Sequence, residues 1–151
     1  MTYYGHMLRV LACANSQVMT NALAEMDLTA SQGHVMGYIA MQPVPPCPHD
    51  IEEEFQLSHP TVSGLLSRLE KKGFIELKTD PSDRRVRRIY ILPKGLACHE
   101  TMHSTIQSIE ARLVAGFTEE EKAQFDRLLA RAGQNMGVDP NIRKHKEEPD
   151  K

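Results

Sequence analysis

Hydrophobic residues recur every three or four positions over most of this chain, which is the pattern of amphipathic helices. The spacing predicts a first helix over residues 3–25, in which no proline occurs. A second helix is expected to begin after Thr29, a good N-cap residue, and to end before the proline-rich segment 43–48. Proline lacks a backbone N–H and restricts the residue before it, so this segment is predicted to be a stiff connector.

A short helix, a tight turn and another helix are predicted after the connector. The short helix covers residues 49–56 and carries acidic residues near its start, where the helix dipole favours them. Ser58 is the expected cap of the next helix, and Gly73 stands where a C-cap glycine is expected. The buried face of that helix is predicted to consist of Val62, Leu65, Leu66 and Leu69. Two helices joined in this way form a helix-turn-helix.

The apolar period then changes from helical to alternating. Residues 75–79 and 87–92 are predicted to form two strands, joined by the turn sequence Asp80-Pro81-Ser82-Asp83. A long helix is expected from about residue 94 to residue 117. Its apolar stripe is Leu96, Met102, Ile106, Ile109, Leu113 and Phe117. Thr118 and Glu121 form a capping box that opens a last helix through about residue 136, and residues 137–151 are expected to be a mobile tail.

Composition narrows the class of protein. A chain of 151 residues with 40% hydrophobic residues is one domain, with or without extra dimerisation helices. No apolar run is long enough to span a bilayer, and the N-terminus does not resemble a secretion signal, so we expect a cytoplasmic protein with no membrane partner. Three widely spaced cysteines argue against a disulfide framework or a zinc ribbon, and reduced thiols are expected.

The charge is distributed unevenly. The whole chain has a net charge of −2, whereas residues 58–94 contain nine basic and four acidic residues. Residues 1–57 contain one basic and six acidic residues. A basic segment inside an acidic protein indicates a localised phosphate-binding surface, although a solvated charged face has the same composition.

The second helix of the helix-turn-helix has a polar outward face. Once its apolar residues are buried, the side chains that remain outside are His59, Pro60, Thr61, Ser63, Gly64, Ser67, Arg68 and Lys71. Small residues near the start of the helix let the backbone approach base edges, and Arg68 and Lys71 can reach bases or phosphates. A plain surface helix has the same pattern, but the arginine-rich hairpin that follows makes DNA recognition the better interpretation.

The hairpin carries four arginines, Arg84, Arg85, Arg87 and Arg88. A hairpin tip is narrow enough to enter a minor groove, whose negative potential attracts arginine. Asp83 is predicted to brace the guanidinium of Arg85, which would reduce the entropy lost on binding. The alternative is that Asp83 serves only the turn.

These segments resemble the MarR family of bacterial winged-helix regulators. The resemblance rests on Leu69-Glu70-Lys71-Lys72-Gly73-Phe74-Ile75-Glu76, on Asp80-Pro81-Ser82-Asp83-Arg84-Arg85 and on Leu92-Pro93-Lys94-Gly95. Leu28-Thr29-x-x-Gln32 and residues 58–63 also resemble the starts of two family helices. The similarity covers about residues 8–136; the departures are Pro93, where the family usually has Thr, and the connector 43–48.

The resemblance implies a mainly α fold with a small β-hairpin, in which a winged helix-turn-helix is flanked by dimerisation helices. The implied parts are an N-terminal dimerisation helix at 1–28, a DNA-binding region at 29–94 and C-terminal dimerisation helices at 95–136. It also implies a homodimer on a palindromic operator in double-stranded DNA, with Arg85 as the minor-groove arginine. Repression is the expected outcome, because a dimer that covers promoter DNA blocks polymerase without further machinery.

Three kinds of sensor are compatible with the resemblance. Family members often bind a small organic effector between the dimer helices and the winged domain, but nothing in this sequence selects a ligand. Cys13 lies in the first helix, as the reactive cysteine of peroxide-sensing relatives does, at a different helical position and without a nearby positive charge. A small buried hydrophobic residue is therefore the expected role of Cys13.

Zinc is the third possibility. His99 and His103 are four residues apart, which can place two imidazoles on one ion, and His34 resembles a ligand of zinc-responsive family members. The remaining ligands do not match, because Gly33 replaces an acid and Gln107 stands where another histidine is expected.

An enzyme is not expected. The chain has no glycine-rich phosphate loop, no nucleophile elbow and no carboxylate pair with the geometry of an active site. The acidic residues 52–54 are interpreted as a solvated face. The alternatives to an effector-controlled repressor are a zinc-responsive regulator of the same fold and a non-specific architectural DNA-binding protein.

Overall fold

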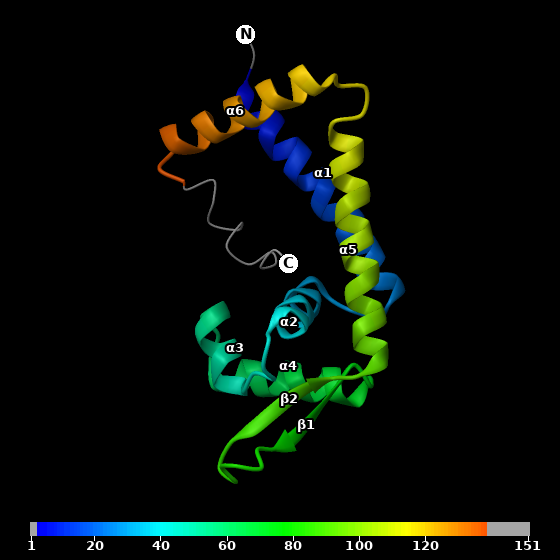
Figure 1. Cartoon of the computed structure of the whole chain (residues 1–151), viewed down its shortest axis with the longest axis vertical. Helices are drawn as coiled ribbons and strands as arrows, with labels where there is room; N and C mark the ends of the chain where they lie inside the picture. The colour runs from blue at the N-terminus through cyan, green and yellow to red at the C-terminus, as the bar shows by residue number, and fades with distance from the viewer. Residues whose placement is uncertain (1–2, 139–151) are drawn as a thin grey trace. The chain divides into compact units, whose positions relative to one another are not determined.

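The computed structural model describes residues 3–138, which include six helices and one hairpin (Figure 1). The elements are α1 Tyr4–Glu25, α2 Ala30–Met41, α3 Pro48–Phe55, α4 His59–Lys71, β1 Ile75–Thr79, β2 Arg87–Ile91, α5 Pro93–Leu113 and α6 Glu119–Asn135. Within the described residues, 3–109 form one compact unit and 110–138 form a second. None of the helices between residues 3 and 138 has the length and hydrophobicity that crossing a membrane requires.

The expected elements are all present in the predicted order, which confirms a mainly helical fold with a small hairpin. The Thr29 hydroxyl accepts the Gln32 N–H at 3.3 Å, and the Gln32 amide oxygen accepts the Thr29 N–H at 3.0 Å, so α2 begins with a complete capping box. The predicted capping box of Thr118 and Glu121 is also formed. The expected mobile tail lies outside the described residues, apart from Gly137 and Val138.

The long helix ends earlier than predicted, at Leu113 rather than near Phe117. Gly116 has φ +83°, a left-handed conformation that glycine adopts without strain, and it ends the helical path before the Thr118 cap. The predicted apolar stripe of α5 is also divided, because Met102 and Ile109 are buried whereas Leu96 and Ile106 are exposed.

The core of the first unit lies between α2, α3, α4, the hairpin and the adjoining part of α5. The predicted stripe of α4 is buried, and Leu69 and Val62 are fully so. The antiparallel hairpin pairs Ile75 with Ile91 and Leu77 with Ile89, so its apolar side chains share one face, as predicted. The proline-rich connector lies beside the hairpin, because the Ile89 N–H donates to the Pro46 carbonyl at 2.8 Å.

Gly95 marks the point where the start of α5 packs most tightly. A Cβ at this position would press into the Phe74 carbonyl oxygen and lie 2.7 Å from Ile91 Cγ1 and 2.9 Å from Met36 Cε. The Phe74 carbonyl is backbone and accepts the Leu92 N–H at 3.0 Å, so it cannot move aside without loss of that bond. The glycine therefore sets how closely α5 approaches the hairpin.

We predict that Gly95→Ala lowers the free energy of unfolding by about 1–3 kcal/mol, the usual cost of overpacking a core. Gly37→Ala is the matched control, because a Cβ at this position inside α2 would meet no atom within 4 Å and alanine has the higher helix propensity. Urea denaturation at one protein concentration measures both. Equal stabilities for the two variants would contradict the tight approach of α5.

Candidate nucleic-acid interface

Helix α4 is oriented by its buried stripe. Because that stripe faces the core, the opposite face is exposed, and the predicted outward residues lie where the sequence places them. His59, Pro60, Thr61, Ser63, Ser67, Arg68 and Lys71 are exposed, and Gly64 is half-buried. A polar, solvent-facing helix of this kind is what the major groove of DNA accepts.

The turn before α4 differs from the prediction in one detail. Gln56 has a left-handed backbone with φ 52°, which ends α3. Ser58 is the N-cap residue of α4, but its hydroxyl makes a 2.8 Å hydrogen bond with the Thr61 hydroxyl instead of accepting a backbone N–H. The first backbone bond of the helix runs from the Val62 N–H to the Ser58 carbonyl.

The predicted ion pair between Asp83 and the Arg85 guanidinium is wrong: a different carboxylate holds a different arginine. Asp83 accepts the backbone N–H of Arg85 at 2.9 Å and forms no ion pair with its guanidinium. Asp80 instead accepts the Nε–H of Arg88 at 2.8 Å, and its other oxygen accepts the Ser82 N–H at 2.7 Å. Asp83 is therefore a turn residue, which was the alternative interpretation.

The pair of Asp80 and Arg88 ties the hairpin to the proline-rich connector. Arg88 also donates from Nη1 to the Pro45 carbonyl at 3.3 Å, next to the bond between Ile89 and Pro46. The hydrogen bond from Arg88 holds the pKa of Asp80 below its ordinary value, and Asp80 raises the pKa of Arg88 in return. The connector thus supports the hairpin, a role that its proline content alone did not indicate.

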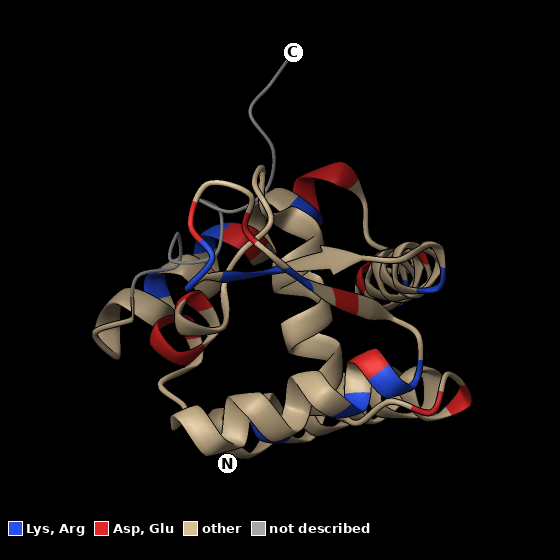
Figure 2. Ribbon diagram, turned by 90° about the horizontal axis from the view of Figure 1, so that it is seen from below, with Lys and Arg blue, Asp and Glu red and all other residues tan. Residues whose placement is uncertain are grey.

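The arginines at the hairpin tip remain available. Within residues 3–138 the guanidinium groups of Arg84 and Arg85 form no ion pair and no hydrogen bond, and both residues are exposed. Arg87 is exposed but donates from Nη2 to the Leu77 carbonyl at 3.1 Å. Figure 2 shows the basic residues of the hairpin in blue beside the acidic residues of the same segment.

Part of the basic segment is used inside the protein. Lys72 Nζ lies 3.2 Å from a carboxylate oxygen of Asp27, in the turn between α1 and α2. Lys94 donates to the Lys72 carbonyl at 2.7 Å and lies 4.4 Å from the centre of the Phe74 ring. These lysines and Arg88 attach α4 and the hairpin to their neighbours, so the charge available to DNA is smaller than the count of nine basic residues indicates.

Glu52 on α3 has a partner that the sequence interpretation missed. Its carboxylate lies 2.6 Å from His59 Nδ1 and 3.4 Å from His49 Nδ1, although residues 52–54 were interpreted as a solvated acidic face. The hydrogen bond with His59 lowers the pKa of Glu52, and the hydrogen bond with Glu52 raises the pKa of His49. Glu52 and His59 lie on two different helices, so their spacing of seven residues does not predict a contact. The turn between the helices decides whether the two side chains meet.

The suggested zinc ligands do not converge in the described part of the chain. His34 and His103 are exposed, and His103 Nε2 lies 3.1 Å from the Gln107 amide nitrogen. Burial lowers the pKa of His99, whose Nδ1 is buried without a hydrogen-bond partner. No three histidine, cysteine or acidic side chains between residues 3 and 138 are placed to hold one ion. Zinc binding stays a prediction, and operator binding that is indifferent to a chelator would contradict it.

Cys13 is exposed on α1, so the expectation that it is a small buried hydrophobic residue is wrong for this chain. The buried cysteine is Cys98 on α5, and burial raises the pKa of its thiol. Cys47 is half-buried at the N-cap of α3.

A helix-turn-helix followed at once by a two-stranded hairpin with free arginines at its tip defines a winged-helix DNA-binding protein. Comparison with known proteins identifies the family. Residues 26–86 match the sequence profile of the MarR family. YsmB of Bacillus subtilis, an uncharacterised helix-turn-helix transcriptional regulator, is 30% identical over 87 residues, which are 58% of this chain and 60% of YsmB.

Solved structures extend the similarity over most of the chain. The MepR–DNA complex of Staphylococcus aureus is 30% identical, with a TM-score of 0.77, and covers 88% of this chain and 99% of its own. MepR, a transcription regulator of the S. aureus multidrug efflux pump MepA, has a TM-score of 0.79 and 30% identity, with 90% of this chain and 99% of its own covered. The chain therefore belongs to the MarR family of DNA-binding transcriptional regulators.

We predict that Asp80→Asn loosens the hairpin, because it removes the negative charge that pairs with Arg88 and leaves an amide oxygen for the turn. Thermal unfolding is expected at a lower temperature, and the Ile89 amide is expected to exchange faster with solvent. Because Arg88 lowers the pKa of Asp80, this stabilisation is complete above the ordinary pKa of aspartate and is lost as the pH falls through the lowered value.

The matched control is Asp83→Asn, which makes the same charge change three residues away and keeps the acceptor for the Arg85 N–H. It is expected to unfold and to exchange like the natural chain. A larger effect from Asp83→Asn than from Asp80→Asn would restore the original assignment of the brace.

Proposed function

We propose that this protein is a transcriptional repressor that binds a palindromic operator as a homodimer. One observation carries the proposal: the exposed polar face of α4 lies next to a hairpin whose Arg84 and Arg85 side chains have no partner within residues 3–138. One continuous segment thereby presents both a polar helix and unpaired arginines, two features that can contact DNA. MepR, to which this chain is similar, has been solved in complex with DNA.

The geometry supports a separate role for α4 and for the hairpin tip. Small polar residues at the start of α4, among them Thr61 and Ser63, leave room for the helix to approach base edges, while Arg68 can reach a guanine or a phosphate. The tip arginines fit the minor groove beside the same half-site, where the negative potential is strongest in A·T-rich DNA. In a symmetric dimer two α4 helices would then occupy major grooves roughly 34–36 Å apart.

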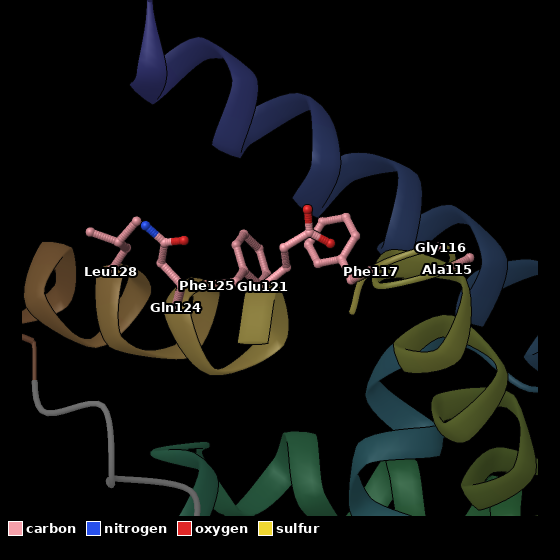
Figure 3. A pocket seen from close by; sticks show the side chains of 7 residues that line it. All are labelled: Ala115, Gly116, Phe117, Glu121, Gln124, Phe125 and Leu128. Atoms are coloured by element: carbon pink, nitrogen blue, oxygen red, sulfur yellow. The ribbon is translucent and has the colours of Figure 1, made fainter. Parts of the chain in front are cut away.

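Exposed apolar side chains support the homodimer. On α1 and just before it, six large apolar residues are exposed, and these are Tyr3, Tyr4, Met7, Leu8, Val10 and Leu11. In the second unit, Phe117, Phe125 and Leu128 point to the same side of α6 and line a hollow of about 500 Å³ (Figure 3). Large apolar surfaces on soluble proteins mark interfaces, and a second copy of the chain is the partner proposed for them.

We also propose that a small organic effector changes the affinity for DNA. A hollow of about 410 Å³ lies between α1 and α5 in the first unit, which is large enough for a small molecule. It is lined by Val18, Asn21, Ala22, Glu25, Ser104, Thr105 and Ser108. A ligand there would contact α1 and α5, the two long helices that continue from the winged helix-turn-helix.

We predict that Arg85→Ala weakens binding to the DNA duplex that the natural chain selects from a random library by about 1–3 kcal/mol, the range for one specific arginine contact. Fluorescence anisotropy measures the affinity. Arg112→Ala, which removes an exposed arginine at the end of α5, is the control and should bind like the natural chain. Unchanged affinity for Arg85→Ala would contradict the assignment of the hairpin. Equal binding to a scrambled duplex would favour a non-specific architectural protein.

We predict a homodimer at micromolar concentration in analytical ultracentrifugation. Leu8→Glu is expected to shift the protein toward monomer, because it places a charge on the exposed apolar face of α1 without disturbing the core. Val44→Glu, which charges an even more exposed apolar residue in the connector, should remain dimeric. A monomeric natural chain would refute both the interface and the palindromic operator.

A further inference from the structure

We propose that Glu52 is a positioning residue of the DNA-binding surface, which holds His59 by Nδ1 so that Nε2 of the same ring can donate to a DNA phosphate. The proposal rests on the proposed DNA-binding function and adds Glu52 to the residues that serve it. It gives one of the four acidic residues of α3 a role in a surface where an isolated acid would repel DNA.

Glu52 lies on α3, which a short turn joins to α4 (Figure 1). Its carbonyl accepts the N–H groups of Gln56 and Leu57 and so ends α3. Its neighbour Ile51 is fully buried, which orients this part of α3 on the core. The Glu52 side chain, only 19% exposed, then lies 2.6 Å from the ring of His59, the first residue of α4.

The contact determines where His59 carries its protons. A carboxylate only accepts hydrogen bonds, so Nδ1 must carry a hydrogen in this pair. Nε2 is the remaining position, and the side chain is 76% exposed. When the ring is protonated, Nε2 also carries a hydrogen and becomes a donor at the N-terminal end of α4, where phosphates bind favourably. The imidazolium simultaneously offsets the charge of Glu52.

The further charged contacts of this corner are made by residues of α3. The second oxygen of Glu52 lies 3.4 Å from His49 Nδ1, and His49 Nε2 lies 3.2 Å from Glu53. Asp50 accepts the Cys47 N–H at the start of α3. On α4 itself the first charged residue after His59 is Arg68. Two histidine rings therefore lie beside two carboxylates. A positive charge on either ring would reduce the electrostatic repulsion between this corner of the surface and DNA.

The expected behaviour follows from the charges. Histidine is the side-chain type whose charged form becomes favoured as the pH falls from 8 to 6. Because its pKa is raised, His49 keeps its second proton to a higher pH than an isolated histidine does. DNA affinity should therefore be higher at pH 6 than at pH 8. A simple solvated acid would give a different result, because its removal would strengthen DNA binding at every pH.

The experiment compares Glu52→Ala with Glu53→Ala on the duplex that the natural chain selects from a random library. The two variants lose the same charge from adjacent positions, but only Glu52 contacts His59. At pH 6, Glu52→Ala is expected to bind on the order of tenfold more weakly, as the loss of one charge-assisted hydrogen bond implies. Glu53→Ala should bind as tightly as the natural chain or more tightly. Glu52→Gln keeps an oxygen acceptor for Nδ1 and should restore most of the affinity.

A double-mutant cycle separates positioning from a structural role. In a His59→Ala background, Glu52→Ala should cause no further loss, and the fall in affinity from pH 6 to pH 8 should be smaller than in the natural chain. Melting temperatures of all variants identify any that fail to fold. Long-range proton–nitrogen NMR of the free natural chain provides a test without variants, because it should show His59 protonated on Nδ1.

The outcomes distinguish the two proposals. A natural chain that selects no DNA at either pH overturns the proposed function. A chain that selects DNA, but in which Glu52→Ala binds as tightly as Glu53→Ala or in which neutral His59 is protonated on Nε2, overturns the role of Glu52 and leaves the function standing.

Discussion

The burial of one stripe of α4 is the constraint on which the rest of the structure depends. Val62, Leu65, Leu66 and Leu69 occupy the centre of the first unit, and each fully buried side chain of this size contributes about 1.5–3 kcal/mol. Because this face of α4 packs in the core, its polar face must lie in solvent. The same packing brings α3 across the start of α4 and the hairpin against its end, so the DNA-facing surface is assembled by the core beneath it.

Some basic side chains of this protein hold parts of the fold together, and others remain unpaired at the surface. Lys72, Arg88 and Lys94 are directed to a carboxylate or to backbone carbonyls inside the fold, whereas Arg84 and Arg85 project from the hairpin tip. The paired cations attach α4 and the hairpin to their neighbours, and the unpaired arginines at the hairpin tip remain available to a ligand. Because these contacts hold the base of the hairpin in place, its backbone loses less entropy on binding, and no ion pair is required at the tip itself.

Local features of the fold could be predicted because their physical causes are local. The caps at Thr29 and Thr118 depend on residues three positions apart, and the hairpin depends on alternation around a turn of Asp80 to Asp83. The boundary of α5 was missed because the sequence continued its apolar period while Gly116 left the helical conformation. The exposed polar face of α4 was predicted correctly because burial and exposure alternate at helical spacing.

The sequence by itself determined the order of the elements, the buried face of α4 and the family, since these depend on periodicity and on a contiguous motif. Only the tertiary structure decided which partner each charged side chain meets. Asp80 rather than Asp83 holds an arginine, and Glu52 reaches His59 across a turn. Such pairs depend on the direction in which the chain returns after a turn, and that direction is set by the packing of distant apolar residues rather than by the residues of the pair.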